Sequence, residues 1–243
     1  KIVFIGSGAI ATAIGNVLAE KNQDEVYLLS IENEVIEMIN ETHVNSIYFP
    51  KVRLKDTLRA TADKQILSQA DIVFLAIPST AVVDYVKENK AYINPKAIVV
   101  NLAKGFGNDG NIIPDSIKPL IPNKIMTLKG PSFAREIISR MDTGLTAAAD
   151  DTALFDVMAD VVEGTKIRTD YSTDVTGVEY ASILKNIYAI VIGIVDAHFD
   201  SANLRSIFIT MALNEMRSLI TTFGGEEKTM YNYCGFGDVS RPA

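Results

Sequence analysis

The chain opens with Lys1-Ile2-Val3-Phe4-Ile5-Gly6-Ser7-Gly8-Ala9-Ile10-Ala11-Thr12-Ala13, an apolar strand that runs directly into G-x-G-x-x-A and a helix-forming segment. Here Gly6 permits a tight turn, Gly8 lets the backbone approach a pyrophosphate, and Ala11 keeps the helix close to the strand. The first N–H groups of the helix would face phosphate oxygens. Glycines at this spacing also occur in ordinary strand-to-helix turns, but the preceding apolar strand favours a dinucleotide-binding turn.

Outward from this stretch, apolar runs of strand length alternate with segments of helix length. Residues 10–20 supply the crossover helix of the first βαβ unit. This alternation predicts an α/β fold, a Rossmann-type doubly wound and mostly parallel sheet. The expected strands are Ile2–Ile5, Val26–Leu29, Ile72–Ile77, Ala97–Leu102, Ile125–Leu128 and Leu145–Ala149.

The pattern changes after about Thr173, where strand-length runs stop and long helical patterns cover residues 175–197 and 203–223. We therefore expect a dinucleotide-binding domain at 1–172 and an all-helical substrate and catalytic domain at 173–243. The most apolar stretch without charge, residues 186–195, is shorter than the ~20 residues that span a bilayer. It predicts a buried core helix and no membrane span.

Composition narrows the class of protein. The chain of 243 residues carries 23 Lys and Arg against 30 Asp and Glu, and this net charge of −7 disfavours a nucleic-acid partner. Cys234 is the only cysteine, which excludes an intrachain disulfide and is compatible with a reducing compartment. A strand begins at Lys1, so no signal peptide is visible, and a cytoplasmic location is expected. His43 and His198 are isolated, so no metal site is predicted.

Two expected strands end in polar or glycine-containing segments, Pro78-Ser79 and Ala103-Lys104-Gly105-Phe106. Both ends would open onto the carboxyl edge of the sheet, where ligands bind in such folds. Lys104 is either a site residue or a solvated surface lysine, and its position beside a glycine at a strand end leaves both interpretations open.

The segment Gly130-Pro131-Ser132-Phe133-Ala134-Arg135-Glu136 follows the expected strand at 125–128 and opens a helix. Its N–H groups and the Ser132 hydroxyl could hold an anion or could simply cap the helix. The segment alone does not separate these two interpretations.

Lys185 lies in a markedly apolar helical stretch. An ammonium group there is costly without partners, and a desolvated lysine can have a lowered pKa and exchange a proton near neutral pH. A lysine whose stem lies along the helix edge with its head in water is the competing interpretation. Asp238, after Gly235-Phe236-Gly237, could orient such a lysine or cap a turn.

Taken together and in order from Gly6 to Asp238, these segments resemble the NAD(P)-dependent glycerol-3-phosphate dehydrogenase family. Each motif is modest, whereas their joint order over nearly the whole chain is specific. The matching segments are G-S-G-A-I-A-T-A at 6–13, N-S-I-Y-F-P at 45–50, I-P-S at 77–79, A-K-G-F at 103–106, G-P-S-F-A-R-E at 130–136, G-V-E-Y-A-S-I-L-K-N at 177–186 and G-F-G-D at 235–238.

The resemblance implies interconversion of sn-glycerol 3-phosphate and dihydroxyacetone phosphate by hydride transfer with NAD(H) or NADP(H), which supplies glycerol 3-phosphate for phospholipid synthesis. It implies that Lys185 is the catalytic lysine, which donates or accepts the proton at the reacting oxygen, and that Asp238 positions it. The implied substrate-site residues are Lys104, Gly130, Ser132, Lys185 and Asp238. The implied cofactor-binding residues are Gly6, Gly8, Ala9, Ile10, Ala11, Tyr48, Lys104 and Ala134.

The chain departs from the family pattern in several places. Ile10-Ala11 replaces a bulky residue and glycine, and Met211 replaces a usual arginine. The family continues past the aspartate into a threonine-rich loop, a phosphate clamp and further helices, so the second domain is incomplete here relative to the family. After the second strand, Ser30-Ile31-Glu32 offers no arginine for a 2′-phosphate, which favours NAD and leaves NADP open.

Two other functions fit the residues less fully. One is another lysine-dependent Rossmann dehydrogenase, such as a ketopantoate reductase or a relative of 6-phosphogluconate dehydrogenase, against which the segment at 130–136 argues. The other is a nucleotide-binding module without turnover. The apolar helices after Thr173 could also form the interface of a homodimer.

Overall fold

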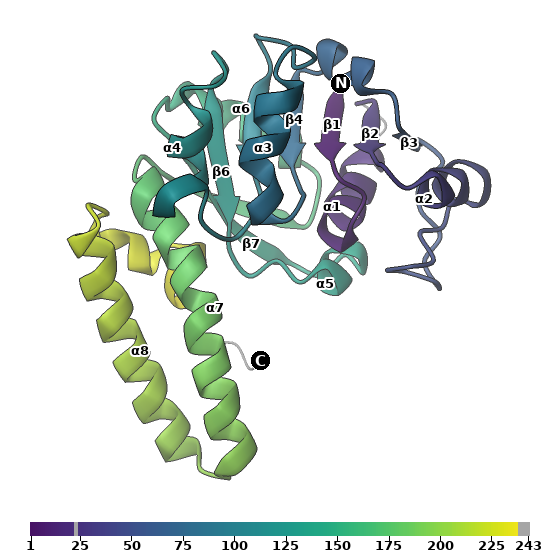
Figure 1. Cartoon of the computed structure of the whole chain (residues 1–243). Helices are drawn as coiled ribbons and strands as arrows, with labels where there is room; N and C mark the ends of the chain where they lie inside the picture. The colour runs from purple at the N-terminus through teal and green to yellow at the C-terminus, as the bar shows by residue number, and fades with distance from the viewer. Residues whose placement is uncertain (22–23, 238–243) are drawn as a thin grey trace.

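The structure, a computed structural model, describes residues 1–21 and 24–237. Within them one eight-stranded sheet has the order β3-β2-β1-β4-β5-β6-β7-β8 (Figure 1). The six strands β1 to β6 are parallel, β7 runs antiparallel to β6, and β8 is parallel to β7. The strands are β1 (Ile2–Ile5), β2 (Val26–Leu29), β3 (Leu58–Thr61), β4 (Ile72–Leu75), β5 (Ile98–Asn101), β6 (Ile125–Lys129), β7 (Thr143–Ala149) and β8 (Ile167–Ser172). The mostly parallel sheet is confirmed.

Helices cover both faces of this sheet. One apolar cluster joins α1, α5 and α6 to one face, and a second joins α3 and α4 to the other. The helices are α1 (Ala9–Ala19), α2 (Asn33–Glu37), α3 (Ser79–Asn89), α4 (Ile113–Ile117), α5 (Ala134–Ile138), α6 (Ala153–Val162), α7 (Val175–His198) and α8 (Ala202–Thr222), with shorter 3-10 or π-helical turns η1 (Met38–Thr42), η2 (Lys64–Gln69), η3 (Asn108–Gly110), η4 (Glu227–Tyr231) and η5 (Tyr233–Gly237).

The central strands β1 and β4 are apolar throughout because both of their faces are covered. In β1, Ile2 and Phe4 pack into one cluster while Val3 and Ile5 pack into the other. Phe4 also stacks on Phe74 of β4, with ring centroids 4.5 Å apart. The sheet is therefore doubly wound, as the alternation of strands and helices predicts.

Two strands, β3 and β8, were not predicted from the sequence, and both lie at the edges of the sheet. Arg59 of β3 is exposed, and β8 has only its first and last residues buried. An edge strand does not need a continuous apolar run, because one side of it meets solvent. Apolar runs in the sequence therefore do not indicate β3 and β8.

The long helix α7 begins beside the sheet and leaves it (Figure 1). Asp174 caps it, accepting a hydrogen bond from the N–H of Gly177 at 2.8 Å. Its first half packs on β6 and β7, whereas Ile187, Ile190 and Ile194 in its second half are more than half exposed. The prediction of a buried core helix is therefore wrong for this second half, which runs beyond the sheet alongside α8.

By length and composition alone, α7 could cross a membrane, and it is the one helix with this property among the residues described. Half of its apolar window is buried inside the protein. A core helix that packs on a sheet passes the same test, so this property does not indicate a membrane protein.

Candidate active site

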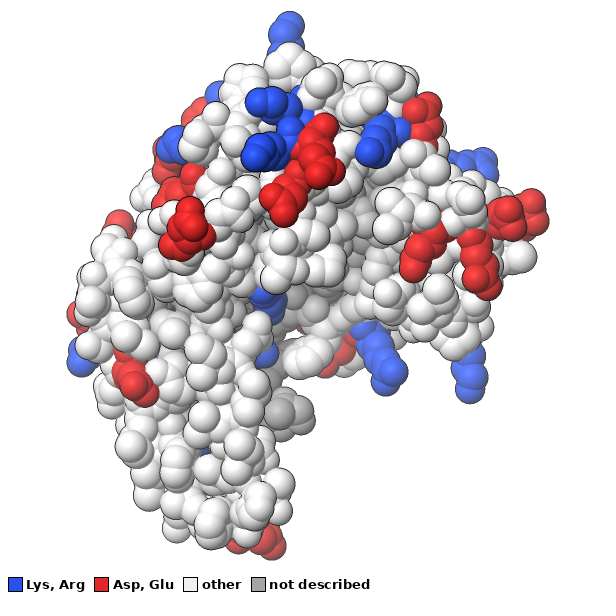
Figure 2. Space-filling model, in the orientation of Figure 1, with Lys and Arg blue, Asp and Glu red and all other residues white. Residues whose placement is uncertain are grey.

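The carboxyl ends of the parallel strands meet at one edge of the sheet, and α7 runs past that edge (Figure 1). Figure 2 shows a hollow between the α7–α8 arm and the body of the sheet, with Lys or Arg atoms visible at its inner wall. This edge is where doubly wound folds bind ligands.

The turn between β1 and α1 has the backbone geometry that a phosphate cradle needs. Gly6 has a φ of +111°, and a Cβ there would lie 2.7 Å from the carbonyl oxygen of Ala76, so only glycine fits. Gly8 is the N-cap residue of α1 and has no side chain to occupy the space before the helix. The first N–H groups of α1, from Ala9 to Ala11, lack acceptors within the helix and are suited to phosphate oxygens.

The segment at 45–50 is tied to this turn. The side-chain amide of Asn45 donates to the carbonyl oxygen of Ser7 at 3.1 Å and to Thr12 Oγ1 at 2.9 Å. The hydroxyl of Tyr48 lies 4.0 Å from the position that a Cβ on Gly8 would take. The structure thus brings the sequence-predicted Tyr48 to the glycine turn.

A cavity of about 360 Å³ extends from the glycine turn over the end of β2 toward α3. Burial raises the pKa of Tyr85 in its wall to about 12. The size, the mainly apolar wall and the N–H groups at one end fit the adenosine and pyrophosphate part of a dinucleotide. Its lining includes Gly6, Ser7, Gly8, Ser30, Ile31, Glu32, Tyr48, Lys64, Pro78 and Tyr85.

Two predicted lysines converge on the segment after β6. The Nζ of Lys104 donates to the carbonyl oxygen of Gly130 at 3.2 Å. The Nζ of Lys185, a half-buried residue, lies 5.7 Å from the centroid of the Phe133 ring. Residues that follow β5 and β6 and a residue of α7, far apart in the chain, therefore meet at one corner of the edge.

The other predicted residues near this corner belong to the same segment. Gly130 has a φ of +147° and is buried, Ser132 is half-buried, and Ala134 is the first residue of α5. Asp238 lies outside the described residues.

A buried ion pair at this corner was not predicted from the sequence. Lys129 and Glu179 have fully buried side chains, with Nζ and Oε1 3.3 Å apart. Lys129 also donates to the carbonyl oxygen of Ala103, and Glu179 accepts from Asn101 Nδ2 at 2.8 Å and from the hydroxyl of Thr127. Burial lowers the pKa of Lys129, and the carboxylate of Glu179 opposes that shift.

The sequence did carry one weak signal for this pair. Each charge stands inside an apolar element, Lys129 at the end of a central strand and Glu179 in the apolar first half of α7. A charge in such a place requires a partner. The identity of the partner, fifty residues away, is visible only in the fold.

The two histidines of the chain have partners other than the predicted site residues. His43 Nε2 is 3.6 Å from Asp56, and His198 bonds through Nδ1 to the carbonyl oxygen of Ile194. Across residues 1–21 and 24–237, no group of three His, Cys, Asp or Glu side chains could hold a metal ion.

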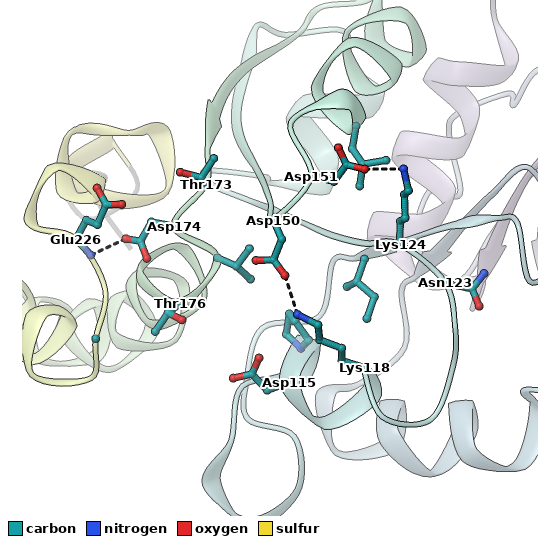
Figure 3. Close-up of a pocket in the computed structure, with 15 residues that line it drawn as sticks. Asp115, Lys118, Asn123, Lys124, Asp150, Asp151, Thr173, Asp174, Thr176 and Glu226 are labelled. Atoms are coloured by element: carbon teal, nitrogen blue, oxygen red, sulfur yellow. Dashed lines mark hydrogen bonds and ion pairs between the residues drawn. The ribbon is translucent and has the colours of Figure 1, made fainter.

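A second cavity, of about 460 Å³, lies between α4, the start of β6, the end of β7 and the start of α7 (Figure 3). Its two lysines are already ion-paired, Lys118 with Asp150 at 2.8 Å and Lys124 with Asp151 at 2.5 Å. Strand ends of the opposite edge form this cavity, so the predicted site residues do not line it.

Comparison with known proteins agrees with this geometry. The family model for the NAD-dependent glycerol-3-phosphate dehydrogenase N-terminus matches residues 1–155, and the model for the C-terminus of the same family matches residues 174–241. A relative from Leptospira biflexa named glycerol-3-phosphate dehydrogenase (NAD(P)+) is 34% identical, over 98% of this chain and 73% of its own length.

Solved structures show the same relation. A crystal structure of glycerol-3-phosphate dehydrogenase from Coxiella burnetii is similar with a TM-score of 0.91 at 28% identity, over 98% of this chain and 74% of that one. A ketopantoate reductase from Ralstonia eutropha has a TM-score of 0.60 at 14% identity, which shows a shared fold alone. This chain spans about three quarters of the length of the first two relatives.

Proposed function

The chain belongs to the NAD-dependent glycerol-3-phosphate dehydrogenase family, and we propose that it interconverts sn-glycerol 3-phosphate and dihydroxyacetone phosphate with NAD(H) or NADP(H). The observation that carries this proposal is the meeting of Lys104, Lys185 and the Gly130–Ala134 segment at the edge that also holds the glycine turn. The product of the reductive direction would supply phospholipid synthesis.

The β1–α1 turn holds the cofactor in this proposal. Gly6 and Gly8 admit the pyrophosphate, and the N–H groups of Ala9, Ile10 and Ala11 bind it. Tyr48, Lys104 and Ala134 contact the cofactor from the opposing segments. When bound, the nicotinamide supplies or accepts the hydride, and the protein contributes orientation and charge.

Lys185 transfers the proton. As an ammonium group it donates a proton to the carbonyl oxygen, where negative charge develops during reduction. During oxidation its neutral amine form takes the proton of the substrate hydroxyl. Lys104, Gly130 and Ser132 line the substrate site beside it, and the cation of Lys104 attracts the anionic substrate. Asp238 positions Lys185.

The cofactor preference is for NAD. Glu32 and Ile31 follow β2 at the rim of the adenosine cavity, and a carboxylate there repels a 2′-phosphate. Lys64 is the one cation among the described lining residues, so NADP also binds, but more weakly than NAD.

The wider organisation follows from the same reasoning. The chain divides near Ser172, at the end of β8, into a dinucleotide-binding domain and a helical domain that carries Lys185. The exposed apolar residues of α7 and α8 form a homodimer interface. The protein acts in the cytoplasm, with a phosphorylated small molecule and no nucleic acid as its partner.

The test is a rate assay of NADH oxidation with dihydroxyacetone phosphate, and with ketopantoate in a parallel reaction. We expect turnover with the first compound alone and glycerol 3-phosphate as the product. Turnover with ketopantoate alone would replace this proposal by the other reductase. NADH binding without turnover of either compound would indicate a module without catalysis.

A further inference from the structure

Two lysine side chains connect the segments at the ends of β5 and β6, one reaching from each segment to the other. Lys129, the last residue of β6, donates from Nζ to the carbonyl oxygen of Ala103 beyond β5. Lys104, the next residue after Ala103, donates from Nζ to the carbonyl oxygen of Gly130, the next residue after Lys129. Each strand end therefore holds the other through a lysine side chain.

Glu179 connects α7 to the same two strand ends. One of its carboxylate oxygens is bonded to the side chains of Asn101 in β5 and of Thr127 in β6, and it lies 3.3 Å from Lys129 Nζ. These three donors come from two neighbouring strands, and the carboxylate comes from the helix above them. A single buried atom thus fixes the position of α7 relative to both strand ends.

The helix connects this point to the proposed catalytic lysine. Glu179 and Lys185 are six residues apart in α7, which is about 9 Å along the helix axis. A continuous α-helix transmits a shift at one position to the other, because its backbone hydrogen bonds keep it rigid over this length.

Resting on the proposed function, we propose that the Lys129–Glu179 ion pair is a positioning device for the reaction: it sets Lys185 on α7 against Lys104 and the Gly130–Ala134 segment. Both residues are positioning residues, since neither touches the open cavity with its fully buried side chain. The pair acts on turnover through the place of Lys185.

A role in stability alone accounts poorly for such a pair. Removing two charges from water costs about as much as their attraction returns, and well-packed apolar residues often stabilise a core as well or better. What the pair does provide is one bonded arrangement of three elements, whereas apolar contacts tolerate small shifts.

The experiment compares the chain with Lys129→Met and with Lys124→Met. Lys124 is a matched control, because it precedes the same strand and is also ion-paired, but it lies at the opposite edge of the sheet and is exposed. We expect Lys129→Met to lower kcat about 10–100-fold, as misplacement of a catalytic group does, with the Kd for NADH within about twofold of the parent. Lys124→Met should leave both constants within about twofold.

A second pair of substitutions guards against a simple folding defect. The double variant Lys129→Met/Glu179→Gln contains no unpaired buried charge, and its amide oxygen still accepts from Asn101 and Thr127. We expect its thermal midpoint to return toward that of the parent while kcat stays low. Return of kcat together with the midpoint, or parental kcat in folded Lys129→Met, would overturn the inference.

Amide hydrogen exchange across residues 176–186 keeps this test independent of the proposed function. Absence of turnover by the parent chain would contradict the proposed function, and the exchange measurement would still decide the present inference. We expect faster exchange in this segment for Lys129→Met and no change for Lys124→Met. Unchanged exchange in Lys129→Met would contradict the coupling of the pair to α7.

Discussion

The two ends of the ligand-binding edge present different chemistry. At the β1–α1 turn, the groups that face the cavity are backbone N–H groups and the small residues Gly6, Ser7 and Gly8. At the corner formed by the ends of β5 and β6 and by α7, charged side chains come together, among them Lys104 and Lys185. Backbone groups and a fixed turn suit binding, whereas charges near a reacting atom suit proton transfer. We therefore expect substitutions at the two ends to affect different constants.

The largest effect belongs to the charged end. Lys185→Ala removes the proposed proton donor, and general acid catalysis contributes ~10²–10⁴-fold to rate. We expect kcat for dihydroxyacetone phosphate reduction to fall by that factor, measured as the decay of NADH absorbance. The exposed Lys124→Met provides a control, and parental kcat in Lys185→Ala would show that another group moves the proton.

The next effect belongs to the glycine turn. In Gly6→Ala the new Cβ would lie 2.7 Å from the carbonyl oxygen of Ala76, at a φ of +111°. Strain of ~1–3 kcal/mol corresponds to NADH binding weaker by about 5–150-fold, measured by fluorescence titration. Gly164→Ala is the matched control, because its φ is also positive at +75° but no atom lies within 4 Å of the new Cβ. Equal losses of NADH affinity in both variants would mean that the β1–α1 turn is not the part of the chain that binds the cofactor.

A smaller change sharpens the binding end. Ile31 is 92% exposed and lines the adenosine cavity beside Glu32. In Ile31→Arg a guanidinium could pair with a 2′-phosphate, and we expect the ratio of NADPH to NADH affinity to rise about tenfold, which is ~1.4 kcal/mol. Ile47→Arg, at another exposed position, controls for added charge. A rise of the affinity ratio by the same factor in both variants would mean that the added positive charge causes it, whatever its position.

The smallest effect on catalysis is expected at the start of α7. Asp174 caps α7 and accepts from the backbone N–H of Glu226 at 2.7 Å (Figure 3). Asp174→Ala should lower the free energy of unfolding by about 1–2 kcal/mol, measured by urea titration, as loss of a cap does. We expect kcat and the Kd for NADH to stay within about twofold. A large fall in kcat would show that the helix start also positions Lys185.

The same contrast explains what the sequence could predict. The glycine turn is local, since Gly6, Gly8 and the flanking strand lie within one short stretch, and the sequence indicated it directly. The sequence also predicts that Lys185 lies on a helix and that Lys104 follows a strand. Both lysines meet at the Gly130–Ala134 segment, at the carboxyl edge of the sheet where a ligand site was expected.

The buried pair could not be predicted, because its energetics depend on distant residues. A lysine in a sequence predicts a solvent-exposed side chain. Lys129 is buried only because its ammonium group pairs with Glu179 and donates to the carbonyl oxygen of Ala103. The edge strands β3 and β8 were missed for a related reason, since their polar residues are tolerated by their place at the rim of the sheet.

The most direct test of a division between binding and turnover compares Gly6→Ala with Lys185→Ala in the same two assays. NADH binding and dihydroxyacetone phosphate reduction are measured side by side for the parent, Gly6→Ala and Lys185→Ala. We expect Lys185→Ala to bind NADH with the parental Kd but to turn over about 10²–10⁴-fold more slowly, and Gly6→Ala to bind NADH weakly but to approach the parental kcat at saturating NADH. Loss of NADH binding in Lys185→Ala, or equal losses of kcat in both variants, would contradict it.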